Sequence, residues 1–162
     1  MIGKVVDRIT LAVALDSRRA KGERIVFTNG CFDILHVGHV RYLQQARALG
    51  DLLVLGLNSD ESVRGLKGAS RPLVPEDERA EMLAALQCVD YVSVFSESRP
   101  DALIEVVRPN IHVKGGDYRE EDLPEAAVVR RHGGRVAILP LVEDRSTTNI
   151  VARILEVYGG DR

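Results

Sequence analysis

The chain has 162 residues, of which 45% are hydrophobic and 28% charged, so it suits one domain with a full core and has no room for a second catalytic domain. Nucleic acid is not expected as a partner, because the net charge is −2 and few aromatic side chains could stack on bases: four tyrosines, three phenylalanines and no tryptophan. The apolar run Ile9 to Leu15 is too short to cross a membrane and makes a poor signal peptide. Two distant cysteines fit a reduced compartment, so we expect a cytoplasmic protein.

Hydrophobic periodicity predicts helices and strands that alternate along the chain. Expected helices cover residues 5–15, 37–49, 75–87, 100–107, 124–132 and 146–158, and expected strands cover 24–28, 52–57, 91–95, 111–114 and 135–139. A loop with Arg64, Lys67 and Arg71 should precede the third helix. The alternation predicts an α/β protein with a Rossmann-like, open parallel five-stranded sheet and helices on both faces.

The stretch Thr28 to His39 is the most informative part of the sequence. A strand runs into a polar turn, and a helix that carries His36 and His39 follows, so both imidazoles should point the same way. A helix N-terminus attracts anions, and Gly38 removes a side chain that would keep a phosphate away. We interpret this as a phosphate site. The alternatives are two ordinary surface histidines or a metal site, and the latter lacks further ligands at suitable spacing, so we expect no metal held by the protein.

Polar segments follow four of the predicted strands, at residues 29–39, 58–60, 115–118 and 146–149. Ligands of open parallel sheets bind beyond the carboxyl ends of the strands, where the strand order reverses. Neither a dinucleotide-binding fingerprint nor a P-loop occurs, and Cys31 is expected to pack at a strand end rather than to act as a nucleophile. A phosphate that attacks the α-phosphorus of a nucleoside triphosphate needs positioning and charge neutralisation, which two histidines, a lysine and a helix N-terminus supply.

Four segments together resemble the adenylyltransferase domain of the bifunctional heptose-phosphate kinase/adenylyltransferase of lipopolysaccharide precursor synthesis. They are Gly30 to His39, Leu66 to Pro72, Val113 to Tyr118 and Ser146 to Ile150. The His-x-Gly-His element marks the wider nucleotidyltransferase superfamily, and the last two segments narrow it to this group. The resemblance spans about residues 24–158 and lacks the sugar-kinase domain. It implies a stand-alone enzyme with an N-terminal helical extension, 1–22, and a nucleotidyltransferase domain, 23–162.

The resemblance implies a role for each matching residue. His36, His39 and Lys67 would act at the reacting phosphorus and on phosphate oxygens. The nucleotide would be bound by Cys31, Phe32, Gly38, Arg79, Gly115, Gly116, Asp117, Ser146, Thr147 and Thr148. Alternatively, the hydroxyls from Ser146 onward form an ordinary helix cap, and Lys67, Arg71 and Arg79 belong to a solvated basic face.

The implied reaction transfers AMP from ATP to a heptose 1-phosphate, with Mg²⁺ bound through the ATP phosphates. Glycerol-phosphate cytidylyltransferases carry an arginine where this chain has Leu141, which favours the heptose enzyme, and Arg145 is a candidate replacement for that charge. Two alternatives stay open: a cytidylyltransferase that uses CTP and a polyol phosphate, and a nucleotide-binding module without turnover. A homodimer or higher homo-oligomer is expected, and the N-terminal helix offers one candidate apolar face.

Overall fold

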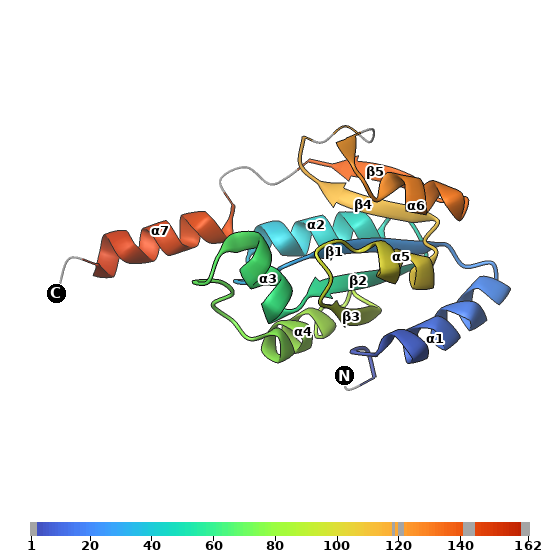
Figure 1. The fold of residues 1–162 in the computed structure, drawn as a ribbon, viewed down its shortest axis with the longest axis horizontal. Coiled ribbons are helices and arrows are strands. Elements are labelled where there is room, and N and C mark those ends of the chain that lie inside the picture. Colours follow the sequence, from blue (N-terminus) through green and yellow to red (C-terminus); the bar gives the residue numbers. More distant parts are fainter. Residues whose placement is uncertain (1–2, 118, 120–121, 141–144, 160–162) are drawn as a thin grey trace.

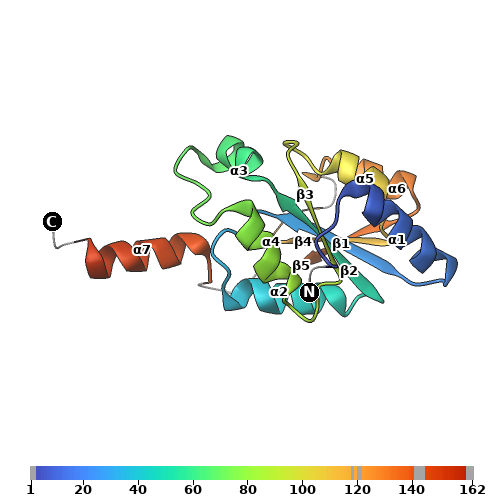
Figure 2. The ribbon, with the colours of Figure 1, turned by 90° about the horizontal axis from the view of Figure 1, so that it is seen from below.

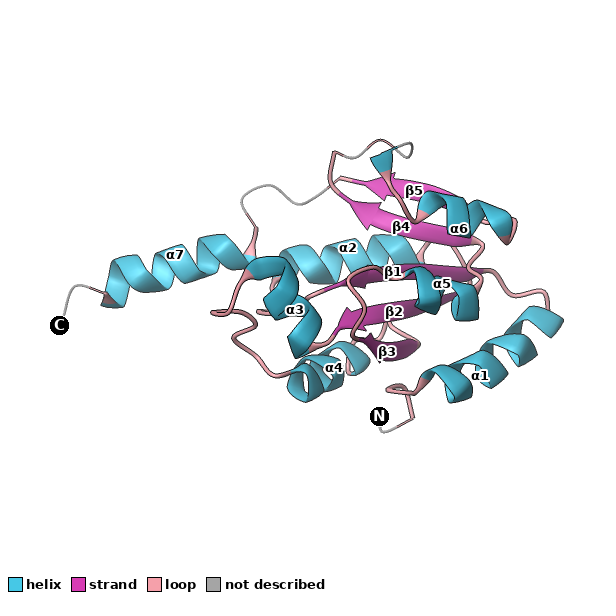
Figure 3. Cartoon of the chain, in the orientation of Figure 1, coloured by secondary structure: helices cyan, strands magenta, loops and turns pink. Residues whose placement is uncertain are grey.

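The computed structural model describes residues 3–117, 119, 122–140 and 145–159, and shows a five-stranded parallel sheet with helices on both faces (Figures 1 and 3). The strands are β1 (Ile25–Gly30), β2 (Leu52–Asn58), β3 (Tyr91–Phe95), β4 (Ile111–Gly115) and β5 (Arg135–Leu139). Their order is β3-β2-β1-β4-β5, so the order reverses between β1 and β4. The predicted fold class is confirmed.

Two cores lie on opposite faces of this sheet because successive strand side chains point to opposite sides. Side chains of α2 (Val37–Arg47) and α4 (Glu76–Ala84) pack with Val26 and Leu53 on one face. On the other face, α1 (Arg8–Ala20), α5 (Asp101–Val107) and α6 (Ala126–Arg131) pack with Ile25 and Phe27 (Figure 2). Every residue of β2 is buried, as expected for a strand covered on both faces.

The N-terminal helix begins and ends later than predicted, because it covers Arg8–Ala20 rather than residues 5–15. Asp7 caps it by accepting a hydrogen bond from the Thr10 amide at 2.7 Å. Its Leu11 and Leu15 are buried against the sheet, whereas Ile9 is 81% exposed. The helix therefore uses its leucine face for the core, which the apolar pattern alone did not distinguish from an outward face.

The predicted loop at residues 64–71 is partly wrong. Helix α3 (Asp60–Lys67) contains Arg64 and Lys67, and Ser59 caps it. The Ser59 cap and the acidic first turn after it were the signals for this helix. The helix was missed because it is short and follows directly on β2. Asn29 and Gly30 likewise belong to β1 rather than to a turn.

Helix α7 (Thr147–Tyr158) extends away from the sheet and its covering helices (Figures 1 and 2). Ser146 is its N-cap, as the sequence predicted, and none of its residues is buried. Within the part of the chain that the structure describes, no helix has both the length and the apolar character needed to cross a membrane.

Candidate functional site

A cavity of about 640 Å³ lies over the carboxyl ends of the strands, where the strand order reverses. It collects ten of the residues that the sequence singled out. These are Cys31, Phe32, His36, Gly38, His39, Lys67, Gly115, Ser146, Thr147 and Thr148. Residues more than a hundred positions apart in the sequence thus line one space, as a binding site requires.

The two histidines stack at the start of α2. His36 is the N-cap residue rather than a member of the helix, and its ring centroid lies 3.8 Å from that of His39, with 24° between the ring planes. Phe32 has a left-handed backbone, with φ of 45°, and its ring meets His39 edge-on at 5.1 Å. The expected common direction of the two imidazoles is confirmed.

Gly38 makes this stack sterically feasible. A Cβ at this position would lie 2.9 Å from the Cε1 and Nδ1 atoms of the His36 ring and 3.1 Å from the Arg145 Cβ. Any larger residue would therefore displace the His36 ring from His39. The glycine makes room for an imidazole, whereas the sequence suggested that it makes room for a phosphate.

Both imidazoles are less basic than usual. Burial, with His36 beside it as the second cause, lowers the pKa of His39 from 6.5 to about 4. Burial and then the Arg145 guanidinium lower the pKa of His36. The Nδ1 atoms of both rings are buried and have no hydrogen-bond partner among the described residues. Orphaned polar atoms of this kind suit a site that a polar ligand completes.

The N-terminus of α7 forms another wall of the cavity. The Ser146 hydroxyl accepts a hydrogen bond from the Asn149 amide at 3.1 Å, and the Thr147 hydroxyl donates to the Ile34 carbonyl at 3.4 Å. Ser146 is thus an ordinary cap and also a lining residue, while the exposed Thr148 has no role in capping. Hydroxyls at a helix N-terminus are well suited to phosphate oxygens.

The end of α3 and the segment after it bring cations to the cavity. Lys67 is exposed and lines the cavity, and Arg71 donates through Nε to Asp33 at 2.5 Å. The buried Asp33 also accepts from the amides of Leu73 and Val74. Burial works to raise the pKa of Asp33, but the Val74 amide and the Arg71 guanidinium outweigh it and hold that pKa below its usual range. Asp33 therefore stays ionised and anchors this segment beside the histidines.

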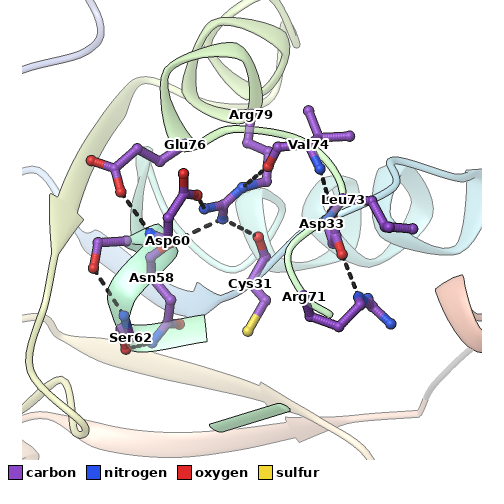
Figure 4. Close-up of polar contacts among 11 residues, drawn as sticks. Cys31, Asp33, Asn58, Asp60, Ser62, Arg71, Leu73, Val74, Glu76 and Arg79 are labelled. Atoms are coloured by element: carbon purple, nitrogen blue, oxygen red, sulfur yellow. Dashed lines mark hydrogen bonds and ion pairs between the residues drawn. The ribbon is translucent and has the colours of Figure 1, made fainter. Parts of the chain in front are cut away.

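Arg79 has a different role from the predicted one. Its side chain is fully buried and does not line the cavity. It donates to the carbonyls of Val74, Cys31 and Asn58, and to the Asp60 carboxylate at 2.7 Å (Figure 4). Because the protein engages all its nitrogens, Arg79 ties together the ends of β1 and β2 and the segment before α4 instead of reaching into the cavity.

Gly116 and Asp117 also lie outside the lining of the cavity, in contrast to Gly115. Gly116 has a φ of 128°, which glycine tolerates best, and its amide donates to the Leu139 carbonyl at 3.0 Å. It shapes the turn after β4, and Asp117 follows it with an exposed side chain. Tyr118, at the end of the same predicted segment, and Leu141 lie outside the described residues.

Sequence reasoning missed several charged and polar lining residues. Lys114, at the end of β4, pairs with Glu125 at 2.8 Å, and Asn29 and Arg99 line the same side. Arg145 lines the cavity beside His36, which supports its candidacy as the replacement charge. The signal for Asn29 and Lys114 was their place at the ends of the two strands that flank the reversal.

The carboxylates that line the cavity are engaged in ion pairs. Asp33 is bonded to Arg71, and Glu125 is bonded to Lys114. Among the described residues, no group of three or more His, Cys, Asp or Glu side chains could hold a metal ion.

A family model described as cytidylyltransferase-like matches residues 27–153, which contain all the cavity-lining residues. The chain belongs to this family. Bifunctional HldE proteins of Pelobacter propionicus and Syntrophotalea carbinolica are 57% and 59% identical to this chain over 155 residues. Each alignment covers 96% of this chain and 32% of the relative. The chain thus spans about a third of the length of these curated relatives. The resemblance seen in the sequence is confirmed.

Solved structures agree with this assignment. The lipopolysaccharide core biosynthesis protein from Thermoplasma volcanium is 28% identical, with a TM-score of 0.63, over 76% of this chain and all of its own. Pantoate-β-alanine ligase from Francisella tularensis is 14% identical, with a TM-score of 0.57, over 98% of this chain and 80% of its own. The latter similarity shows the fold alone.

The Arg79→Met variant should be less stable by about 3 kcal/mol or more, because three carbonyls and Asp60 lose their buried partner. Urea unfolding measures the difference. Arg64→Met, at an exposed position on α3, is the matched control and should change stability by no more than about 0.5 kcal/mol. Unchanged stability together with a raised KM for ATP would restore Arg79 as a phosphate ligand.

His39 should titrate near pH 4 in the free protein and at higher pH in the presence of tripolyphosphate, because a nearby anion favours the charged imidazole. NMR of the imidazole C–H signals against pH, with and without tripolyphosphate, measures both values. A midpoint near 6.5 without ligand, or one that tripolyphosphate does not raise, would show that the histidine pair is not a desolvated anion site.

Proposed function

We propose that this chain transfers the adenylyl group of ATP to a heptose 1-phosphate, giving ADP-heptose and pyrophosphate for lipopolysaccharide or a related glycan. The observation that carries the proposal is the shared cavity of His36, His39, Lys67 and the hydroxyls at the α7 N-terminus. Similarity to the HldE proteins supports a heptose phosphate over a polyol phosphate as the acceptor.

In the proposed reaction, an oxygen of the sugar phosphate forms a bond to the α-phosphorus of ATP while the bond to the bridging β-phosphate oxygen breaks. The attacking phosphate is already ionised, so no side chain needs to remove a proton. The histidine N–H groups would donate to α-phosphate oxygens, where charge builds up in the transition state. As the polyphosphate raises their pKa, the imidazoles would also gain positive charge at the moment of binding.

The other walls would hold the groups that do not react. Ser146 and Thr148, at the positive end of α7, would bind the β and γ phosphates, and Arg145 would add charge next to His36. Lys67 would neutralise the phosphates from the α3 side. Mg²⁺ would screen the phosphate charges while bound to their oxygens, since Asp33 and Glu125 are already paired. We propose a cytoplasmic location, where ATP is supplied.

Purified protein should release pyrophosphate from ATP, Mg²⁺ and a heptose 1-phosphate, and should use ATP in preference to CTP. His36→Asn and His39→Asn should each lower kcat by about 10²–10³, the usual loss on removing a transition-state donor. His132→Asn is the matched control, because His132 lies at the end of α6 beside Glu105, away from the cavity.

Three outcomes would contradict the proposal in different ways. A preference for CTP would favour a cytidylyltransferase. ATP binding without pyrophosphate release would favour a binding module. Full activity of both His36→Asn and His39→Asn would show that the reaction does not take place in this cavity.

We also propose that two copies associate through α7. None of its residues is buried, and Leu155 and Tyr158 are 63% and 75% exposed on an amphipathic helix that extends from the body (Figure 1). An isolated helix of this length gains most of its stability from packing its apolar face, and a second copy offers a like surface. Helix α1, in contrast, already packs its Leu11 and Leu15 in the core.

Leu155→Glu should convert the dimer to a monomer, as measured by light scattering after size-exclusion chromatography, because a carboxylate would be buried in the apolar contact. Ile9→Glu, at the exposed face of α1, is the matched control and should leave a dimer. Dissociation by Ile9→Glu alone would place the contact on α1, and a monomeric wild type would refute self-association.

A further inference from the structure

One polar side chain in the sheet has no role in the chemistry described above. His112, the second residue of β4, is fully buried and packs on the Phe27 ring at 5.3 Å between ring centroids. Burial, followed by the nearby Lys114 ammonium, lowers the pKa of His112 well below its usual value, so the ring is neutral. A buried neutral imidazole in a sheet needs a partner to offset its lost hydration.

The Asn29 carboxamide is that partner. The Nε2 atom of His112 lies 3.2 Å from Oδ1 of Asn29, which stands at the end of the adjacent strand β1. The Nδ1 atom of His112 is buried and has no partner among the described residues. A neutral imidazole carries one N–H. Placed on Nδ1, this N–H would be a buried donor without an acceptor, whereas on Nε2 it donates to Asn29.

This tautomer fixes the direction of the carboxamide. With Oδ1 accepting from His112, the NH₂ group is the end of the Asn29 side chain that remains for the cavity, which Asn29 lines. Asn29 is half-buried, and its NH₂ group has no acceptor within the described part of the chain. Without the hydrogen bond from His112, the carboxamide could flip and present either its oxygen or its NH₂ group to a ligand.

We propose that His112 is a positioning residue that holds the Asn29 carboxamide with its NH₂ group toward the cavity, where it binds a hydrogen-bond acceptor of one of the two substrates. The inference rests on the proposed function for the identity of those substrates. The shared chemistry is an oxygen or ring nitrogen with a free lone pair, on either ATP or the sugar phosphate.

The place of Asn29 indicates what it adds to the site. Its side chain lies on the sheet face that also carries Phe27 and His112, while Thr28, one residue earlier, bonds Tyr42 of α2 on the opposite face. The histidine pair belongs to the α2 side. Asn29 therefore reaches the ligand from across the edge of the sheet and contacts a part of it away from the His36 and His39 rings.

A double-mutant cycle tests the coupling. Asn29→Ala should raise the KM for one substrate by about tenfold, the loss of one hydrogen bond, with little change in kcat. Separate titrations of ATP and of heptose 1-phosphate identify the substrate. His112→Met should raise the same KM, and the double variant should be no worse than Asn29→Ala, because His112 acts through Asn29. His112→Gln, which keeps an N–H donor, should recover most of the affinity.

A merely structural His112 would give a different pattern. The effects of His112→Met and Asn29→Ala would then multiply, and His112→Gln would resemble His112→Met. Leu15→Ala is the control for lost stability, because it opens the core under α1 and should leave both KM values unchanged. An unchanged KM for both substrates in Asn29→Ala would equally overturn the inference.

A spectroscopic measurement separates this inference from the proposed reaction. Nitrogen NMR of the histidine rings should show His112 as the neutral Nε2–H tautomer, and Asn29→Ala should shift its Nε2–H signal. Finding the proton on Nδ1 would refute the positioning role even in an active enzyme. If the wild type released no pyrophosphate, the proposed function would fail, while the tautomer would still decide the role of His112.

Discussion

The contact between the His36 and His39 rings is the interaction on which the rest of the site depends. Burial lowers the pKa of both imidazoles, and two charged rings at 3.8 Å would also repel each other, so the free site holds them neutral. An anionic ligand removes both penalties at once. The start of α2, the ring of Phe32 and the missing side chain of Gly38 all serve to keep this pair in place before the ligand arrives.

Two buried charged side chains, Arg79 behind the lining and Asp33 within it, give the cavity its shape. Arg79 joins the ends of two strands to the segment before α4, and Asp33 holds the same segment through two amides and Arg71 (Figure 4). Both are buried, and an unpaired buried charge is costly, so each imposes its geometry strongly. These contacts of Arg79 and Asp33 determine the position of Lys67 relative to the histidines. Neither Arg79 nor Asp33 needs to contact the reacting atoms.

The sequence predicted the sheet, its parallel strands and most of the lining, because apolar strands and the polar residues that end them follow local rules. The prediction from sequence failed where contacts between distant parts of the chain determine the structure. Arg79 looks like a surface cation on an acidic helix until the ends of two strands are seen to surround it. Helix α3 is short and strongly polar, so its cap at Ser59 was its main signal. No sequence pattern links His112 to Asn29, since their contact follows only from the neighbouring positions of β1 and β4.

The reversal between β1 and β4 would let one cavity serve both substrates of the proposed reaction. The cavity crosses the edge of the sheet, with the histidine pair and α7 on the α2 side and with Asn29 and the Lys114–Glu125 pair on the other. A triphosphate needs the cationic, donor-rich side, where charge changes during reaction. The other side presents fixed, neutral or paired polar groups, which suit uncharged parts of a ligand. In the proposed reaction, charge stabilisation and selectivity would thus come from separate faces of the same sheet and meet at its edge.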